Sequence, residues 1–208
     1  REFLAMSEWN MEAAEMAGFQ VHRHFLGELT TDFDNRGEDW MRLLHEKLDW
    51  VIRATEESMG RPFVFADADV RFYGDAKHDM LACLGDADIA FQCDWWKHMI
   101  VCQGLWIARG NERVLKLLNH IKGIVSQKLN DQEATNALLK GGYPIDWQVL
   151  PRRYWTAGAG TGIRWNSGDA VNPPPDLMAH HGNWTVGYDN KVELMRAVDT
   201  IMTQEARQ

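Results

Sequence analysis

The sequence has few cysteines, no excess of basic residues and no long apolar run. Its three cysteines (Cys83, Cys93 and Cys102) form no C-x-x-C pair, and an odd number fits reduced thiols rather than a disulfide framework. Lys and Arg number 22 against 30 Asp and Glu, for a net charge of −8, so we expect no nucleic-acid partner. No segment has the length of a membrane span or the pattern of a signal peptide.

Internal repeats, low-complexity tracts and an interdomain linker are also absent from the sequence. The 208 residues suffice for one domain with a full core, and 45% hydrophobic with 25% charged residues is ordinary globular composition. We therefore predict one domain over residues 1–208. Because the sequence begins at Arg1 rather than Met, we allow for a segment upstream of it. The location in the cell stays unknown, with the cytoplasm favoured over the lumen of the secretory pathway.

The most informative stretch is an apolar run, residues 63–70, that ends in two carboxylates, Asp67 and Asp69. The run predicts a buried strand, and the alternation of side chains along a strand places both carboxylates on one side, at its carboxyl end. Two such charges about 5 Å apart repel by roughly 3 kcal/mol at an effective dielectric near 20, and a divalent cation reverses that repulsion. The alternative is a polar turn after a core strand.

Hydrophobic periodicity predicts helices alternating with strands along the rest of the chain. The alternation indicates an α/β sheet with helices on both faces, and ligands of such sheets bind outside the carboxyl ends of the strands. Residues 27–37 and 158–175 are expected to be loops. The expected helices are 7–17, 38–59, 80–84, 111–124, 130–140 and 191–205, and the expected strands are 3–6, 19–26, 63–70, 88–94, 101–108, 145–150 and 177–181.

Five sequence features, in order along the chain, carry a resemblance to a known family. They are Lys47 on the helix before the first carboxylates, the Asp67–Asp69 motif, the segment 102–109 with its central Gly104, the segment 130–136 (NDQEATN), and the segment 181–184 (HGNW) followed by Lys191. Over about residues 40–195 the chain resembles nucleotide-diphospho-sugar transferases of the GT-A type, above all the retaining groups that include glycogenin-like enzymes. The resemblance implies a Rossmann-like mixed central sheet with helices on both faces.

The resemblance implies a Mn²⁺ or Mg²⁺ site formed by Asp67, Asp69 and His181. His180 and His181 point to opposite faces of a strand, so at most one of them can be the ligand. The following residues, Asn183 and Trp184, favour His181. The alternative for His181 is a buried histidine with its hydrogen bonds satisfied.

The resemblance assigns a donor-binding role to Lys47, Asp67, Gly104, Asn136 and Lys191. Lys191 would neutralise diphosphate oxygens, and Gly104 would let the donor sugar approach the backbone. The alternatives are a Lys47 side chain that extends into solvent and an exposed Lys191 at the start of a helix.

Asp131, Gln132 and Asp94 are the candidates for catalysis. Gln132 and Asn136 are four residues apart and share a helix face, while Asp131 lies beside them at the helix start, where the helix dipole favours its ionised form. The resemblance implies a front-side retaining mechanism in which Gln132 or Asp131 steadies the anomeric centre, with Asp94 on the acceptor side. The alternative for Asp131 is a helix N-cap.

The resemblance therefore implies transfer of a sugar from a nucleotide sugar, UDP-linked, to a hydroxyl of a glycan, protein or small-molecule acceptor, with retention of configuration. Two alternatives stay open. One is a haloacid-dehalogenase-like phosphatase, whose first motif is also an apolar strand ending in Asp-x-Asp. The other is a non-catalytic module that binds nucleotide sugars.

Overall fold

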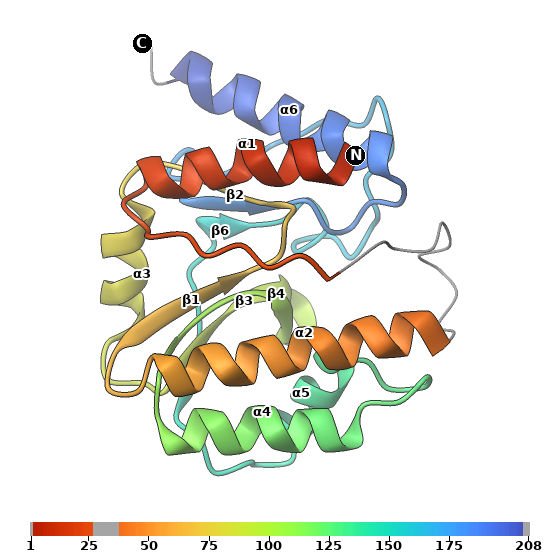
Figure 1. The fold of residues 1–208 in the computed structure, drawn as a ribbon. Coiled ribbons are helices and arrows are strands. Elements are labelled where there is room, and N and C mark those ends of the chain that lie inside the picture. Colours follow the sequence, from red (N-terminus) through yellow and green to blue (C-terminus); the bar gives the residue numbers. More distant parts are fainter. Residues whose placement is uncertain (1, 27–37, 206–208) are drawn as a thin grey trace.

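The larger of two sheets has four strands, and it lies between layers of helices in the computed structural model (Figure 1). The structure describes residues 2–26 and 38–205. The strand order is β1 (Pro62–Ala66), β4 (Ile100–Arg109), β3 (Ile89–Trp95) and β5 (Trp147–Val149). β4 runs antiparallel to β1 and β3, whereas β5 is parallel to β3, so the sheet is mixed, as predicted.

The smaller sheet has three strands in the order β2 (Val70–Phe72), β7 (Ala179–His181) and β6 (Tyr154–Trp155). β7 is antiparallel to β2 and parallel to β6. The chain passes from the larger sheet to the smaller one between β1 and β2, across the Asp67–Asp69 segment. The sequence did not predict β6, which is too short for a periodic pattern.

Helices cover both faces of the larger sheet, as the sequence predicted. One face carries α2 (Glu38–Glu57), α4 (Glu112–Ile124) and α5 (Asp131–Lys140). α1 (Glu2–Met16) and α3 (Ala76–Leu84) pack on the side of the sheet that also contacts β2. α6 (Tyr188–Glu205) lies beside α1 and packs against the buried Trp165 and Leu177 (Figure 1). A short 3₁₀ helix, η1 (Trp96–His98), follows β3.

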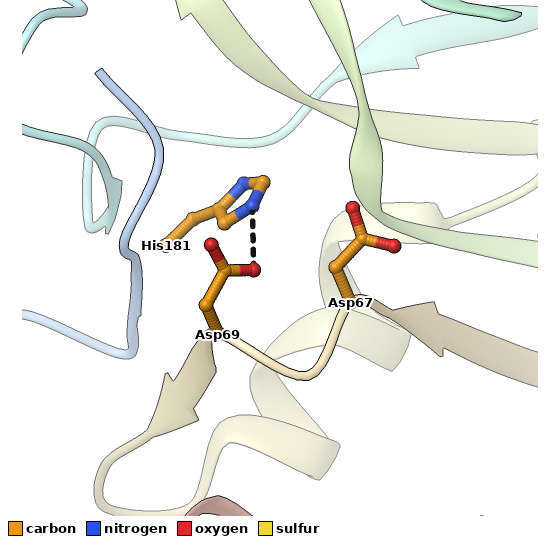
Figure 2. A group of neighbouring side chains, drawn as sticks. All are labelled: Asp67, Asp69 and His181. Carbon is orange, nitrogen blue, oxygen red and sulfur yellow. Dashed lines mark ion pairs between the residues drawn. The ribbon is translucent and has the colours of Figure 1, made fainter. Parts of the chain in front are cut away.

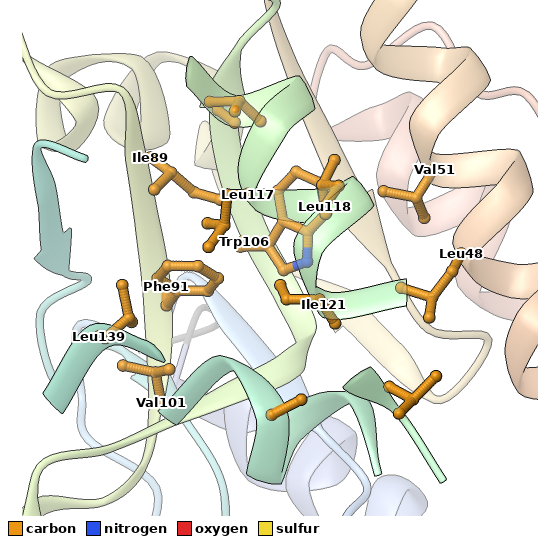
Figure 3. Packing of buried hydrophobic residues seen from close by; sticks show 14 of the residues in the cluster. Leu48, Val51, Ile89, Phe91, Val101, Trp106, Leu117, Leu118, Ile121 and Leu139 are labelled. Carbon is orange, nitrogen blue, oxygen red and sulfur yellow. The ribbon is translucent and has the colours of Figure 1, made fainter. Parts of the chain in front are cut away.

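β4 is buried on both faces, and its alternating side chains join the two main hydrophobic clusters. Trp106 and Ala108 point toward α2 and α4, while Leu105 and Ile107 point toward the opposite cluster. The Trp106 ring lies 6.4 Å from that of Phe91 (Figure 3). It also lies 5.4 Å from the ring of Phe65. The packing of these rings holds β1, β3 and β4 together.

The strand predicted over residues 63–70 ends at Ala66, so the prediction was wrong at its carboxyl end. Asp67 to Asp69 form a turn, in which the Val70 amide donates to the Asp67 carbonyl at 3.1 Å. The turn lets the chain leave the larger sheet and enter the smaller one. Both carboxylates are therefore presented by a turn rather than by alternation along a strand.

Two strands predicted near the N-terminus were also wrong. Residues 3–6 belong to α1, where the buried residues Met6, Asn10 and Ala13 recur at helical spacing. Residues 19–26 pair with no described strand, although Phe19 and Val21 pack against the core. The loop predicted at 27–37 lies outside the described residues.

The other predicted elements are confirmed, with small shifts of their ends. α3 begins earlier than predicted, and α6 begins at Tyr188 rather than Lys191. The strands expected at 145–150 and 177–181 are shorter, and residues 158–175 contain neither helix nor strand. None of the described helices combines the length and the apolar character needed to cross a bilayer.

Candidate active site

Asp67, Asp69 and His181 come together where the two sheets meet (Figure 2). One possible ligand atom from each lies within 4.8 Å of the others. Asp69 reaches His181 because β2 pairs with β7 in a register that sets Val70 opposite His181, and the Gly182 amide donates to the Asp69 carbonyl at 2.8 Å. The Asp69 Oδ1 and His181 Nε2 atoms are 3.3 Å apart.

Gly104 completes this arrangement from β4. The Asp67 amide donates to the Gly104 carbonyl at 2.7 Å, which holds the turn against the middle of β4. A Cβ at position 104 would overlap the His181 ring, with Nε2 only 2.9 Å away, and would lie 2.6 Å from Asp67 Oδ2. A glycine is therefore needed for the three side chains to converge. The predicted approach of a donor sugar to this backbone stays a prediction.

The hydrogen bond that His181 makes through Nδ1 turns its Nε2 atom toward Asp69. Its Nδ1 atom lies 3.0 Å from the side-chain oxygen of Gln92, whose amide nitrogen donates to the Trp155 carbonyl at 3.2 Å. Because that oxygen only accepts, Nδ1 carries the proton. In the neutral ring, Nε2 then presents its lone pair toward Asp69.

The charge states of Asp69 and His181 depend on each other. Burial by itself lowers the pKa of His181, but the Asp69 carboxylate outweighs it and raises that pKa well above its ordinary value. Burial raises the pKa of Asp69, yet Lys191 and His181 hold it well below its usual range. The two carboxylates suit a hard divalent cation such as Mn²⁺ or Mg²⁺, and the imidazole adds a third possible ligand, so the residues present fit a divalent ion.

Two lysines neutralise part of the acidic charge. Lys47 Nζ lies 3.2 Å from Asp67 Oδ1 and 3.2 Å from Asp131 Oδ2. Burial lowers the pKa of Lys47, but Asp131 and Asp67 raise it above its usual value, so the ammonium group stays charged. Lys191 Nζ contacts Asp69 Oδ2. Neither lysine extends freely into solvent, so the alternatives of a solvent-directed Lys47 and an exposed Lys191 were wrong. Contact of the two lysines with a donor stays a prediction.

The start of α5 directs Asp131 and Gln132 into the site. Asn130, not Asp131, is the N-cap: its side chain accepts from the Glu133 amide at 2.7 Å, and the Glu133 side chain accepts from the Asn130 amide at 2.8 Å. The cap thus leaves Asp131, itself 9% exposed, free to pair with Lys47. The N-cap alternative for Asp131 was therefore wrong.

Gln132 and Asp94 line a pocket of about 310 Å³ beside the cluster of Asp67, Asp69 and His181. The Gln132 Nε2 atom donates to Asp94 Oδ2 at 3.0 Å. The pocket is also lined by Arg164, Asn183 and Trp184. The structure therefore brings the predicted catalytic residues together, and their catalytic roles stay predictions.

Asn136 holds α5 against β4. Its side-chain oxygen accepts from the Val101 amide at 2.9 Å, and its nitrogen donates to the Val101 carbonyl at 2.9 Å and to the Gln132 carbonyl at 2.8 Å. Both ends of its amide are thus used by the backbone. The donor contact predicted for Asn136 would have to compete with these bonds and stays a prediction.

Sequence reasoning missed three residues around the site. Gln92 orients His181, and Arg164 lines the pocket. Asn10 is buried in α1, and its side-chain nitrogen donates to the Ala68 carbonyl at 2.8 Å, which braces the Asp67–Asp69 turn. No local pattern marks these residues, because each acts on a segment far away in the sequence.

A comparison with protein families supplies the assignment. A family model described as nucleotide-diphospho-sugar transferase matches residues 10–195. The chain belongs to this family. The transferase is therefore of the GT-A type suggested by its motifs, and its donor is a nucleotide sugar. The haloacid-dehalogenase-like phosphatase alternative was wrong.

The fold of the transferase is similar to that of a solved structure. That structure is described as a glycosyltransferase involved in the glycosylation of the major capsid of PBCV-1, and the match has a TM-score of 0.61. It covers 92% of each chain, at 12% sequence identity. Identity this low supports the fold alone. Among curated proteins no match was found.

Proposed function

We propose that this glycosyltransferase is metal-dependent and moves a sugar from a UDP-linked donor to an acceptor hydroxyl with retention of configuration. The observation that carries the proposal is the convergence of Asp67, Asp69 and His181 next to Gly104. These residues would hold Mn²⁺ or Mg²⁺. When bound, the ion supplies Lewis-acid stabilisation of the leaving diphosphate.

The local charge supports a role for a cation in donor binding. Asp67, Asp69 and Asp131 are balanced by Lys47, Lys191 and a protonated His181, so one negative charge remains once His181 gives up its proton to act as a ligand. A divalent cation changes this balance to a net positive one. Lys191, at the start of α6, is then available to pair with a diphosphate oxygen.

Gln132 and Asp131 would act on the sugar rather than on the diphosphate. Gln132 is a neutral amide, and it can orient groups or steady charge near the anomeric carbon but cannot serve as a good nucleophile. Asp131 stays close to the Lys47 ammonium and can accept a hydrogen bond from a sugar hydroxyl. Asp94 contacts Gln132 in the same pocket, and we assign it to the acceptor side.

The first prediction is that nucleotide binding depends on the metal. In a thermal-shift screen, UDP-sugars with Mn²⁺ should raise the melting temperature, since a ligand at 100 times its Kd adds about 2.7 kcal/mol to stability. After treatment with a chelator, calorimetry should show much weaker binding of UDP. Equal affinity with and without Mn²⁺ would exclude a metal-dependent site.

This screen also separates the enzyme from the remaining alternative, a non-catalytic binding module. Both would show a thermal shift with a nucleotide sugar. Only the enzyme should then release UDP when a mixture of candidate glycan, peptide and small-molecule acceptors is added. Binding without any turnover over such a panel would favour the module.

The second prediction concerns stereochemistry. Proton NMR of the first-formed product should show the anomeric configuration of the donor, because Asp94, the carboxylate that faces Gln132, is held by hydrogen bonds on both oxygens. Gln132→Ala should lower kcat by about 100-fold, as loss of one charge-stabilising group typically does, with little change in donor Kd. An inverted product would contradict the assignment and point to Asp94 as a catalytic base.

A further inference from the structure

The Asp94 carboxylate receives hydrogen bonds on both oxygens from three different side chains. Oδ1 accepts from Asn183 Nδ2 at 2.6 Å and from Trp184 Nε1 at 2.9 Å, and Oδ2 accepts from Gln132 Nε2 at 3.0 Å. Asp94 is only 9% exposed. An acceptor-only group with donors on both oxygens has a defined orientation.

The bond to Asp94 also determines which way the Gln132 amide faces. With Nε2 on Asp94, the Oε1 atom accepts from the Gln103 amide at 3.3 Å. A flipped amide would set an oxygen against the Asp94 carboxylate and an NH₂ group against the Gln103 N–H, and both contacts are repulsive. The carboxylate of Asp94 therefore selects one of two orientations for the amide.

Trp184 is held firmly enough to orient Asp94. Its φ angle is +60°, a conformation in which bulky residues are rarely found and which persists only where the surroundings impose it. Trp165 donates from its amide to the Trp184 carbonyl at 2.7 Å, and the indole nitrogen also lies 3.1 Å from the Asp94 carbonyl. Gly158 lies against the ring, since a Cβ there would come within 2.5 Å of Trp184 Cε3.

Asn183 is oriented by a second contact. Its side-chain oxygen accepts from the Thr156 hydroxyl, so its nitrogen must face Asp94. Thr156 is fully buried. Two donors from the segment after β7 thus hold one carboxylate oxygen, and the other is left for Gln132.

We propose that Trp184 and Asn183 are positioning residues, which fix the Asp94 carboxylate and through it the amide of Gln132 in the pocket. The inference rests on the proposed part of Gln132 in transfer. It adds that the segment after the metal-ligating His181 also sets the geometry of the pocket on its acceptor side. The role assigned to Trp184 is carried by its indole N–H, which donates to Asp94, while Gly158 packs closely against its ring.

The test is Trp184→Phe, which keeps an aromatic ring against Gly158 and Trp95 but removes the N–H donor. We expect kcat to fall about 10-fold to 100-fold, the range in which small misplacements of reacting groups act, with donor KM and melting temperature little changed. Trp96→Phe is the matched control, since this neighbouring ring contacts Arg152 instead, and it should retain wild-type kcat.

A double-mutant cycle separates positioning from general stability. In an Asp94→Asn background the orienting carboxylate is already gone, so adding Trp184→Phe should cost little more in kcat. If Trp184 merely supported the fold, its effect would add to that of Asp94→Asn and would appear in the melting temperature. Additive losses would overturn the proposal.

Asn183→Ser provides a second variant if Trp184→Phe does not fold. It removes one donor from Asp94 without altering the ring, and it should lower kcat in the same way. Wild-type kcat in both variants of an active enzyme would refute the positioning role but leave the proposed function standing. If the wild type itself transfers no sugar, the proposed function fails. The hydrogen bond is then tested alone by NMR: the Trp184 indole N–H resonance should move on Asp94→Ala, and an unmoved resonance would refute the contact.

Discussion

Gly104→Ala should abolish metal-supported transfer, with a loss of at least about 100-fold in kcat/KM at a fixed Mn²⁺ concentration. The added methyl group would overlap His181 and lie 2.6 Å from Asp67 Oδ2. His181 is 4% exposed and is held by Gln92, so its ring can move only by breaking that bond. The measurement is Mn²⁺ affinity by calorimetry together with donor turnover.

The matched control is Gly123→Ala in α4. No atom lies within 4 Å of a Cβ built at Gly123, so this change tests the effect of a methyl group without a clash. We expect unchanged activity and up to about 1 kcal/mol of added stability, because alanine favours a helix over glycine. For Gly104→Ala, overpacking should cost about 1–3 kcal/mol of stability. Normal Mn²⁺ binding by Gly104→Ala would contradict the proposed ligand set.

Asp69→Asn should remove turnover and leave the fold intact. A unit charge about 4 Å from another is worth about 4 kcal/mol at an effective dielectric of 20, so neutralising one ligand should weaken metal binding by roughly 1,000-fold. The asparagine oxygen can still accept from Lys191, which keeps the contact between the β1–β2 turn and α6. Circular dichroism checks that the fold is intact, and calorimetry on the same sample measures the affinity for the metal.

Asp86→Asn is the control for this change of charge. Asp86 is exposed and lies before β3, outside the site, so its neutralisation should affect neither metal affinity nor turnover. An unfolded Asp69→Asn protein would mean that Asp69 is chiefly structural. Wild-type turnover in a folded one would show that the pair of carboxylates does not hold the metal.

Local patterns predicted most of the helices and the strands of the larger sheet. α2 and α4 follow directly from apolar residues at helical spacing, and β4 from a run of apolar residues around Gly104. The predicted strands at 3–6 and 19–26 failed because a short apolar segment fits a helix or an extended loop as well as a strand. Only pairing with a neighbouring strand decides among these, and no described strand pairs with residues 19–26.

The sequence by itself determined the family, and it indicated that the side chains of Asp67, Asp69 and His181 lie close together. An apolar strand leading into two carboxylates is a local signal, and the ordered motifs downstream extend it to His181. The tertiary structure decided how they converge, because the carboxylates lie in a turn between two sheets rather than along one strand.

Only the tertiary structure showed what surrounds these three side chains. Lys47 pairs with Asp67 and Asp131, and Asp94 receives donors from α5 and from the segment after β7. Asp94 and Asn183 are 89 positions apart in the chain, and the contact depends on how two separate sheets pack. The periodicity of apolar residues predicts which face of a helix or strand is buried. Which distant residue contacts a given side chain in the site depends on strand pairing and core packing, and the local sequence does not encode these.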